Sequence, residues 1–349
     1  MAQTPVLLKT FLHVSDLHVG DIDPRSGDAR VSAAAGYTYQ NFTWLDGLLG
    51  HHGRALKELQ EFCAQELSDR GEPFGLLVTG DFTRCGAGSE ISTVQRFFAS
   101  TVDLNSPNGN FVGLNLGAMP AASITGNHDQ WGGSINPIGG GPLASGALVP
   151  NAMPFVLQYP LANGRRLLLA GIDTDFNVSP RGMKRLLARG SFQDQLVTLE
   201  QQLQMLPRLD GDIRVLMAHH SMARTGLVLR MDTASKAALS AFLANQGFSI
   251  LLSGHTHEQL FTTIPVTGRS GTCNVWELTC GSTTQHDQVP YNWRTIVGTL
   301  PTRNWRENTL MVHRLFATPG ATTWKTQAYV RTAKGFGTLG VSGERVIPL

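Results

Sequence analysis

Six short apolar runs, each followed at once by polar residues, constrain the fold of this chain more than any other feature of its sequence. Each run contains four to six residues, which is the length of a buried β-strand. The runs are Phe11–Val14, Phe74–Thr79, Ala122–Thr125, Leu167–Ile172, Ile213–Ala218 and Phe248–Ser253. The pattern predicts a sheet-containing fold with polar residues where the strands end.

Helical patterns lie between several of these runs. Apolar residues repeat at helical spacing over residues 55–67 and 196–206, and residues 234–246 form a third helical segment. Strands that alternate with helices predict a layered α/β fold. From about residue 258 the sequence contains strand-like segments with few helices between them, which predicts a β-rich portion that packs as a second sheet on the first.

Two segments, residues 20–52 and 130–154, are predicted to be loop insertions. Each follows the polar end of a strand, so each could overhang a site at that end. The alternative is that both are ordinary surface loops. His51 and His52 end the first segment and are expected at the surface.

The residues that follow the strands carry carboxylate, amide and imidazole groups. They are Asp16, His18, Asp81, Asn127, His128, Asp129, His219, His220, His255 and His257. Loops at the carboxyl ends of strands are the usual place for an active site in an α/β protein. Because side chains alternate along a strand, Asp16 and His18 should converge if strand geometry persists, whereas the adjacent His219 and His220 should face opposite sides.

This set of side chains suits transition metals. Carboxylate oxygens, imidazole nitrogens and an amide oxygen are donors for borderline divalent ions. Two Asp, one Asn and up to five His are too many for one ion, and they match two metals that share a bridging carboxylate. Fe, Mn, Zn, Co and Ni all accept such donors, so the pattern leaves the identity of the metal open.

The order of these motifs resembles the calcineurin-like metallophosphoesterases over about residues 10–285. The motifs are "SDLH" at 15–18, "GDFT" at 80–83, "TGNHD" at 125–129, "AHH" at 218–220 and "GHTH" at 254–257. The short forms look closest to the bacterial cyclic-nucleotide phosphodiesterase-like branch. The resemblance implies one domain over residues 1–349, folded as a four-layer α/β/β/α sandwich of two mixed sheets flanked by helices.

The resemblance also implies a role for each matching residue. The first metal would take Asp16, His18 and His257, and the second would take Asn127, His219 and His255, with Asp81 as the bridge. His128 would stand beside the substrate as a proton donor or as a stabiliser of the transition state.

Four further residues are candidates for contact with the ligands or the substrate. Arg84 could reach a phosphate, although an ordinary salt bridge is the alternative, and Asp129 could orient His128 or cap a helix. His286 could line the pocket. His220 could lie near the ligands or be purely structural, because Ser221 and Met222 stand where many relatives have prolines.

The implied activity is that of a dinuclear metal-dependent phosphoesterase. It would hydrolyse a phosphodiester, with cyclic nucleotides among the candidate substrates, by attack of a metal-bridging hydroxide on phosphorus. A phosphomonoesterase on the same site is the alternative. A non-catalytic, protein-binding scaffold of the same fold is the rival from another class, but such a protein should have lost ligands, and every expected position is filled here.

The composition limits the classes of partner that the chain is expected to bind. With 28 basic and 26 acidic residues and no basic block, the chain shows no footprint for nucleic acid, and no apolar run approaches membrane-spanning length. A small-molecule phosphoester is the expected partner, with no membrane partner. Residues 1–16 lack a signal-peptide pattern, so a cytoplasmic location is expected. The oligomeric state stays open.

Overall fold

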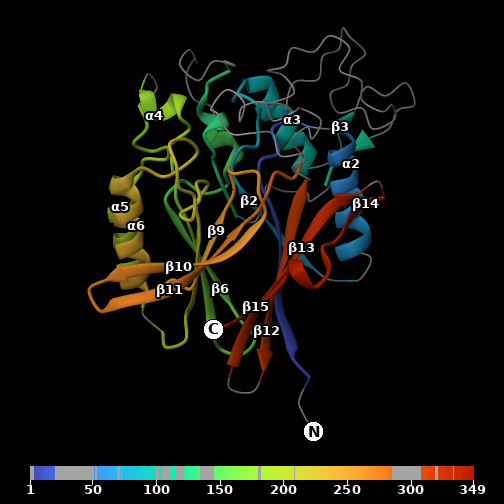
Figure 1. The fold of residues 1–349 in the computed structure, drawn as a ribbon. Helices are drawn as coiled ribbons and strands as arrows, with labels where there is room; N and C mark the ends of the chain where they lie inside the picture. Colours follow the sequence, from blue (N-terminus) through green and yellow to red (C-terminus); the bar gives the residue numbers. More distant parts are fainter. Residues whose placement is uncertain are drawn as a thin grey trace.

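The protein is described by a computed structural model in which two mixed β-sheets pack face to face between two helical layers (Figure 1). The described residues are 4–19, 51, 53–68, 71, 73–99, 102–103, 111–114, 122–133, 145–179, 182–207, 209–284, 308–318, 321–332 and 334–349. The arrangement confirms the four-layer α/β/β/α sandwich expected from the sequence.

The first sheet has seven strands in the order β14-β13-β12-β1-β2-β5, with β15 also paired to β13. Their bounds are β1 Val6–Val14, β2 Phe74–Thr79, β5 Ala122–Ile124, β12 Thr309–Thr318, β13 Ala321–Thr332, β14 Gly335–Thr338 and β15 Glu344–Pro348. β1, β2 and β5 run parallel, and β12 pairs antiparallel with the other edge of β1. The parallel strands are covered on both faces, which explains why their sequences are short apolar runs.

The second sheet has six strands in the order β10-β11-β9-β8-β7-β6. Their bounds are β6 Phe155–Pro160, β7 Arg166–Gly171, β8 Ile213–Met217, β9 Ile250–Ser253, β10 Leu260–Gly268 and β11 Gly271–Thr279. β7, β8, β9 and β11 are parallel, and β6 and β10 are the antiparallel edges. A two-stranded sheet pairs β3 (Val102–Asp103) with β4 (Phe111–Val112).

The strands after residue 258 do not build a sheet of their own in the described part of the chain. Instead, β10 and β11 extend the second sheet, and β12 to β15 extend the first. The sequence-based expectation of a separate tail sheet is therefore wrong. The parallel strands β1 and β9 each leave an open edge, and pairing with β12 and β11 satisfies the backbone groups at those edges.

Helices cover the outer face of each sheet, with α2 and α3 on the first and α5 and α6 on the second (Figure 1). Their bounds are α2 Gly53–Phe62, continued by a π-helical turn at Cys63–Ser68, α3 Gly88–Ala99, α4 Met183–Leu186, α5 Gln193–Gln204 and α6 Thr233–Gln246. Short 3₁₀ turns occupy His128–Gln130, Ser145–Leu148 and Gly340–Gly343. The three helical segments expected from the sequence are confirmed.

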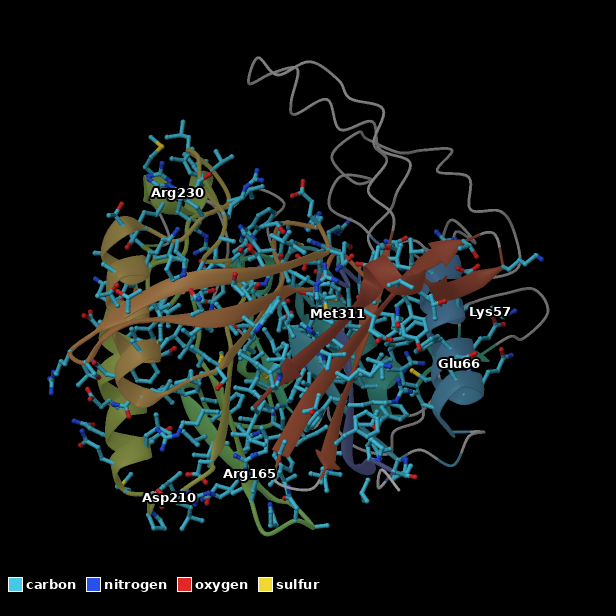
Figure 2. The ribbon with its side chains drawn as sticks, turned by 60° about the horizontal axis from the view of Figure 1, so that its bottom comes forward. Lys57, Glu66, Arg165, Asp210, Arg230 and Met311 are labelled. Carbon is cyan, nitrogen blue, oxygen red and sulfur yellow. The ribbon has the colours of Figure 1, made fainter. Side chains whose placement is uncertain are left out.

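A core of apolar side chains fills the space between the two sheets. Phe11 and Leu77 of the first sheet contribute to the same buried cluster as Val215 and Leu252 of the second. Figure 2 shows Met311 of this cluster near the middle of the molecule. Each such side chain contributes about 1.5–3 kcal/mol by burial, so the sheets are held in one fixed relation. The carboxyl ends of their parallel strands then meet at one side of the molecule.

The predicted loop insertions are only partly covered by the structure. Residues 20–50 and 134–144 lie outside the described residues. His51 is buried, with 1% of its surface exposed, so the expectation of a surface position is wrong for this residue. No helix in the described ranges is long and apolar enough to cross a membrane.

Candidate metal centre

Five of the predicted ligands share an unusual backbone conformation. Asp16, His18, Asp81, His255 and His257 have φ angles of 51°, 50°, 51°, 68° and 54°. Left-handed residues other than glycine are uncommon, and they cluster at functional sites. The strands β1 and β9 end at Val14 and Ser253, so strand geometry does not persist to the ligands. Left-handed turns, and not the expected strand alternation, bring each pair of ligands together.

Two motif glycines let the ligand loops approach each other. A Cβ atom on Gly126 would collide with the Asp81 carboxylate and lie 2.5 Å from its backbone nitrogen. A Cβ atom on Gly254 would collide with the Ser15 hydroxyl and lie 2.8 Å from Asp16 Oδ2. The glycines in "GNHD" and "GHTH" are therefore required by close backbone packing around the carboxylates.

Asp16, His18 and His257 form the first group of donor atoms. Asp16 Oδ1 lies 3.2 Å from His257 Nε2 and 3.9 Å from His18 Nε2, and the two imidazole nitrogens are 3.4 Å apart. The other carboxylate oxygen, Oδ2, accepts a hydrogen bond of 3.0 Å from the His255 backbone nitrogen. Oδ1 has no hydrogen-bond partner among the described residues, so it remains available to the centre.

Asn127, His219 and His255 form the second group. His219 Nε2 lies 3.1 Å from Asn127 Oδ1 and 3.1 Å from His255 Nδ1. His219 and Asn127 come from opposite sheets, because His219 follows β8 and Asn127 follows β5. The second group therefore depends on the packing of the two sheets.

Asp81 connects the two groups. Its Oδ2 lies 3.3 Å from His219 Nε2 and 3.9 Å from His18 Nε2, while its Oδ1 accepts a hydrogen bond of 2.8 Å from the His128 backbone nitrogen. Burial raises the pKa of Asp81, but the charges of His219 and His128 outweigh burial and hold the pKa well below its ordinary value. Asp81 is thus an ionised carboxylate placed between the two groups.

The hydrogen bonds of two imidazoles show that lone pairs converge in the second group. His219 Nδ1 lies 2.7 Å from the Thr79 carbonyl, and His255 Nε2 lies 3.2 Å from the Ala188 carbonyl. A carbonyl only accepts, so these nitrogens carry the protons, and His219 Nε2 and His255 Nδ1 present lone pairs in the neutral rings. Lone pairs of nitrogen and oxygen about 3 Å apart repel each other unless a cation lies between them. The residues present therefore fit a metal ion.

The charges around His219 also favour a bound metal cation. Burial lowers the pKa of His219, but the charge and hydrogen bond of Asp81, the charge of Asp16 and the Thr79 carbonyl raise it to about 10. A neighbourhood that stabilises a proton this strongly also attracts a metal cation. Metal and proton would compete for the same nitrogen.

His128 lies against the first group. Its ring contacts the His18 ring edge-on, with centroids 4.5 Å apart, and stacks on Trp131 at 3.9 Å. His128 Nδ1 donates to the Arg84 carbonyl at 2.9 Å, which leaves Nε2 as the nitrogen that can gain or lose a proton. The Arg84 side chain forms a 3.0 Å ion pair with Glu90, as the salt-bridge alternative predicted.

Asp129 fastens the metal-site loops to each other. Its carboxylate accepts hydrogen bonds from the backbone nitrogens of Phe82, Thr83 and Gly126 at 3.2, 2.9 and 3.0 Å, and from the Thr83 hydroxyl at 2.8 Å. Burial and the charge of Asp81 raise the pKa of Asp129 to about 7. Asp129 was expected to orient His128 or cap a helix. Its bonds instead hold the loop after β2 against the loop after β5.

The remaining candidates lie further from the donor atoms. His220 is buried, its Nδ1 lies 2.7 Å from the Thr174 hydroxyl, and its ring packs 4.1 Å from the His255 ring. His220 thus packs against His255 of the second group. His286 lies outside the described residues.

Glu277 is a supporting residue that carries no motif. It is fully buried on β11 and accepts hydrogen bonds from the backbone nitrogens of Met222 and Ala223 at 2.9 and 2.8 Å. It thereby anchors the loop after His219, in which Ser221 and Met222 stand where the family resemblance implies prolines. A single acidic residue inside the apolar stretch "NVWELTC" is the sequence signal that could have found it.

Of three comparisons with known proteins, the family model supports the metal centre. A family model described as calcineurin-like phosphoesterase matches residues 9–259. A search of curated proteins finds no significant match. Three solved structures also match this chain, with identities and TM-scores too low to support an argument.

The first of these structures is a putative 5'-nucleotidase from Staphylococcus aureus, with 12% identity and a TM-score of 0.43 over 98% of this chain. The chain spans 54% of that protein's length. A conserved uncharacterized protein from Streptococcus pneumoniae, described as a predicted phosphoesterase, has 12% identity and a TM-score of 0.28, with 98% of each chain covered. Vps29 from Chaetomium thermophilum has 10% identity and a TM-score of 0.29, with 97% of each covered.

Proposed function

Because this chain belongs to the calcineurin-like phosphoesterase family, we propose that it is a hydrolase that binds two transition-metal ions and cleaves phosphodiesters. The observation that carries the proposal is the convergence of two groups of donor atoms on one shared carboxylate, Asp81. Asp16, His18 and His257 would hold one ion. Asn127, His219 and His255 would hold the other.

Each part of the centre has a chemical task. Two bound ions would supply a hydroxide nucleophile near neutral pH and would neutralise charge on the phosphoryl oxygens. Asn127 is a neutral ligand, so its ion keeps more Lewis acidity than a further carboxylate would leave it. One carboxylate oxygen of Asp81 and one of Asp16 each accept a hydrogen bond from a backbone nitrogen. These bonds fix the direction of the other oxygen of each carboxylate.

His128 would donate the proton that the leaving group needs. The Arg84 carbonyl fixes Nδ1 and Trp131 holds the ring plane, so Nε2 keeps one orientation. Burial lowers the pKa of His128 below its ordinary value, although the charge of Asp81 and the hydrogen bond to the Arg84 carbonyl oppose this effect. A leaving alkoxide requires a proton, and a positioned acid accelerates such a step by about 10²–10⁴-fold.

The proposal is tested by metal reconstitution followed by assays on two chromogenic esters. We expect close to two ions per chain, measured by elemental analysis after loading with Mn²⁺, and faster turnover of bis(4-nitrophenyl) phosphate than of 4-nitrophenyl phosphate. Faster turnover of the monoester would replace the proposal by a phosphomonoesterase. Less than one ion per chain together with no turnover would indicate a non-catalytic scaffold.

The role of His128 is tested with leaving groups of different basicity. His128→Ala should slow diesters with alkyl leaving groups by about 10²-fold or more, because these leaving groups need the proton. Esters of 4-nitrophenol should lose much less, and they serve as the internal control. Equal losses across the series, measured as kcat/KM, would remove the proton donor from the proposal.

A further inference from the structure

A small recess adjoins the second group of donor atoms. Its lining residues are Asn127, Gln130, Asp175, Val178, Arg185 and Ala188. Asn127 is shared with the second group, and the carbonyl of Ala188 accepts from His255, so the recess begins where the donor atoms end. Its cavity volume is about 10 Å³, close to the space that one water-sized group needs.

Two residues of the lining have a polar atom without a partner. Asp175 is only 9% exposed, and its Oδ2 has no hydrogen-bond partner within the described ranges. The Nε of Arg185 is also buried without a partner there, although its Nη2 donates to the Gln130 carbonyl. Buried polar atoms are nearly always hydrogen-bonded, so two such atoms around one recess indicate a ligand group.

The surrounding hydrogen bonds hold the recess in place. Asp173 Oδ1 accepts from the Asp175 backbone nitrogen at 2.8 Å, and Asp173 Oδ2 accepts from Gln130 Nε2 at 2.9 Å. Gln130 lies three residues after Asn127, in the 3₁₀ turn that begins at His128. The turn after β7 is therefore tied to the turn that carries the metal-site amide. The recess has a fixed position relative to the centre.

The two partnerless atoms define the chemistry of a group that could occupy the recess. A carboxyl oxygen accepts a hydrogen bond when it is ionised and can donate one when it is protonated, and a guanidinium N–H requires an acceptor. A hydroxyl offers both and has the size of a water molecule. A second phosphate group exceeds the space, and an apolar group would leave both atoms unsatisfied.

We propose that this recess binds a hydroxyl of the substrate's alcohol moiety, so that Asp175 and Arg185 select phosphoesters of alcohols that carry a further hydroxyl. This inference rests on the proposed phosphoesterase function, because it places the phosphoryl group at the metal centre. Arg185 comes from α4 and Asp175 from the turn after β7, so selection depends on segments outside the family motifs.

The test compares ligands that differ by one hydroxyl. Binding of 2-hydroxyethyl and 3-hydroxypropyl phosphate to the metal-loaded protein is measured by calorimetry against ethyl and propyl phosphate. At least one hydroxylated ligand should bind about 10- to 100-fold more tightly than its partner, because hydrogen bonds to charged groups are strong. Equal affinities within both pairs would overturn the inference.

Variants assign the preference to the recess. Asp175→Ala and Arg185→Met should each remove the preference and keep the affinity for ethyl phosphate, while Asp175→Asn, which retains an acceptor oxygen, should keep part of it. Arg189→Met is the matched control, because Arg189 lies on the same stretch of chain but donates to the Leu227 carbonyl. Preference that survives in both Asp175→Ala and Arg185→Met would overturn the inference.

Binding selectivity and turnover separate the two proposals. If the protein prefers the hydroxylated phosphates but hydrolyses no ester, the proposed hydroxyl site stands and the proposed phosphodiesterase function is wrong. If the protein hydrolyses diesters but shows no preference in binding, the proposed function stands and the proposed hydroxyl site is wrong. Metal content is measured for every variant, so a loss of the centre is not mistaken for a loss of selectivity.

Discussion

Two clusters of buried histidines lie close together in this protein, and they differ in how their nitrogens are satisfied. In the core between the sheets, His13 Nδ1 pairs with His313 Nε2 at 3.1 Å, His13 Nε2 pairs with the Thr79 hydroxyl at 2.9 Å, and His313 Nδ1 pairs with the Thr326 hydroxyl at 2.8 Å. In the metal centre, imidazole nitrogens also face each other, but their other neighbours are carboxylate oxygens instead of hydroxyl groups. Burial alone therefore does not identify a metal site.

Charge explains why the clusters diverge. Burial lowers the pKa of His13 to about 3, against a weaker opposing effect of Asp16, and burial also holds the pKa of His313 well below its ordinary value. Both core rings are thus neutral. At His219 the nearby carboxylates outweigh burial and raise the pKa to about 10. A histidine cluster becomes a cation site where carboxylates enter it and the ring nitrogens lack other partners.

One residue belongs to both clusters. The Thr79 hydroxyl bonds to His13, and the Thr79 carbonyl accepts from His219. The core pair could therefore influence the centre through the end of β2. The following variants measure how independent the clusters are.

The largest effect is expected from the shared carboxylate. Asp81→Ala should lower kcat/KM on a diester by about 10³-fold, because metal assistance contributes several kcal/mol to the transition state. Elemental analysis should show loss of bound metal, and circular dichroism should show that the variant is still folded. Asp212→Ala is the control, since Asp212 is a well-buried carboxylate that pairs with Arg166 at the opposite end of β7. Equal metal loss in both variants would contradict the assignment.

A smaller effect is expected from Asp129, which touches the loops and not the donor atoms. Asp129→Asn should weaken metal affinity by about 10- to 100-fold, because an amide nitrogen would oppose backbone donors that now bind a carboxylate. Added metal should restore most of the rate, whereas it should not rescue Asp81→Ala. A variant with normal metal affinity would show that the loops keep their geometry without these bonds.

The smallest effect on metal binding is expected from the core pair. The double variant His13→Leu/His313→Leu should bind metal normally and should show a weaker dependence of stability on pH. Because the folded pKa of His13 is about 3 and its unfolded value is 6.5, the unfolded chain binds more protons below pH 6.5. The stability present above pH 6.5 is therefore lost as the pH falls toward 3, by about 1.4 kcal/mol per pH unit for each such histidine.

Urea unfolding of the metal-free protein at pH 7 and pH 5 measures this dependence. The wild-type protein should lose more stability between the two values than the double variant. The same loss in both proteins would show that the core pair does not titrate on unfolding. A loss of metal in the double variant would show that Thr79 couples the two clusters.

Much of the fold follows from local sequence. The strand ends and the predicted ligands could be located because each motif is contiguous and follows an apolar run. The left-handed backbone at Asp16 and His255 could not be predicted, because it arises where loops from both sheets crowd together. The sequence also did not predict that the strands after residue 258 join both sheets. Pairing at an open edge is a property of the assembled sheet and not of the local sequence.

The surroundings of the centre were harder to predict than its donor atoms. Gln130 and Arg185 line the recess from segments 55 residues apart, and no spacing rule connects them. His51 lies just before a helix in the sequence and was expected at the surface, yet the fold buries it. Long-range packing decides these positions.

The pairing of β1 with β12 has a consequence for synthesis of the chain. His13 and His313 are 300 residues apart, so β1 leaves the ribosome long before its antiparallel neighbour exists. At about 5–20 residues per second, this delay lasts for tens of seconds. During that time one edge of β1 has no partner and can pair with another chain. Nascent protein that stalls before β12 should therefore depend on chaperones, even though every predicted metal ligand has already been made.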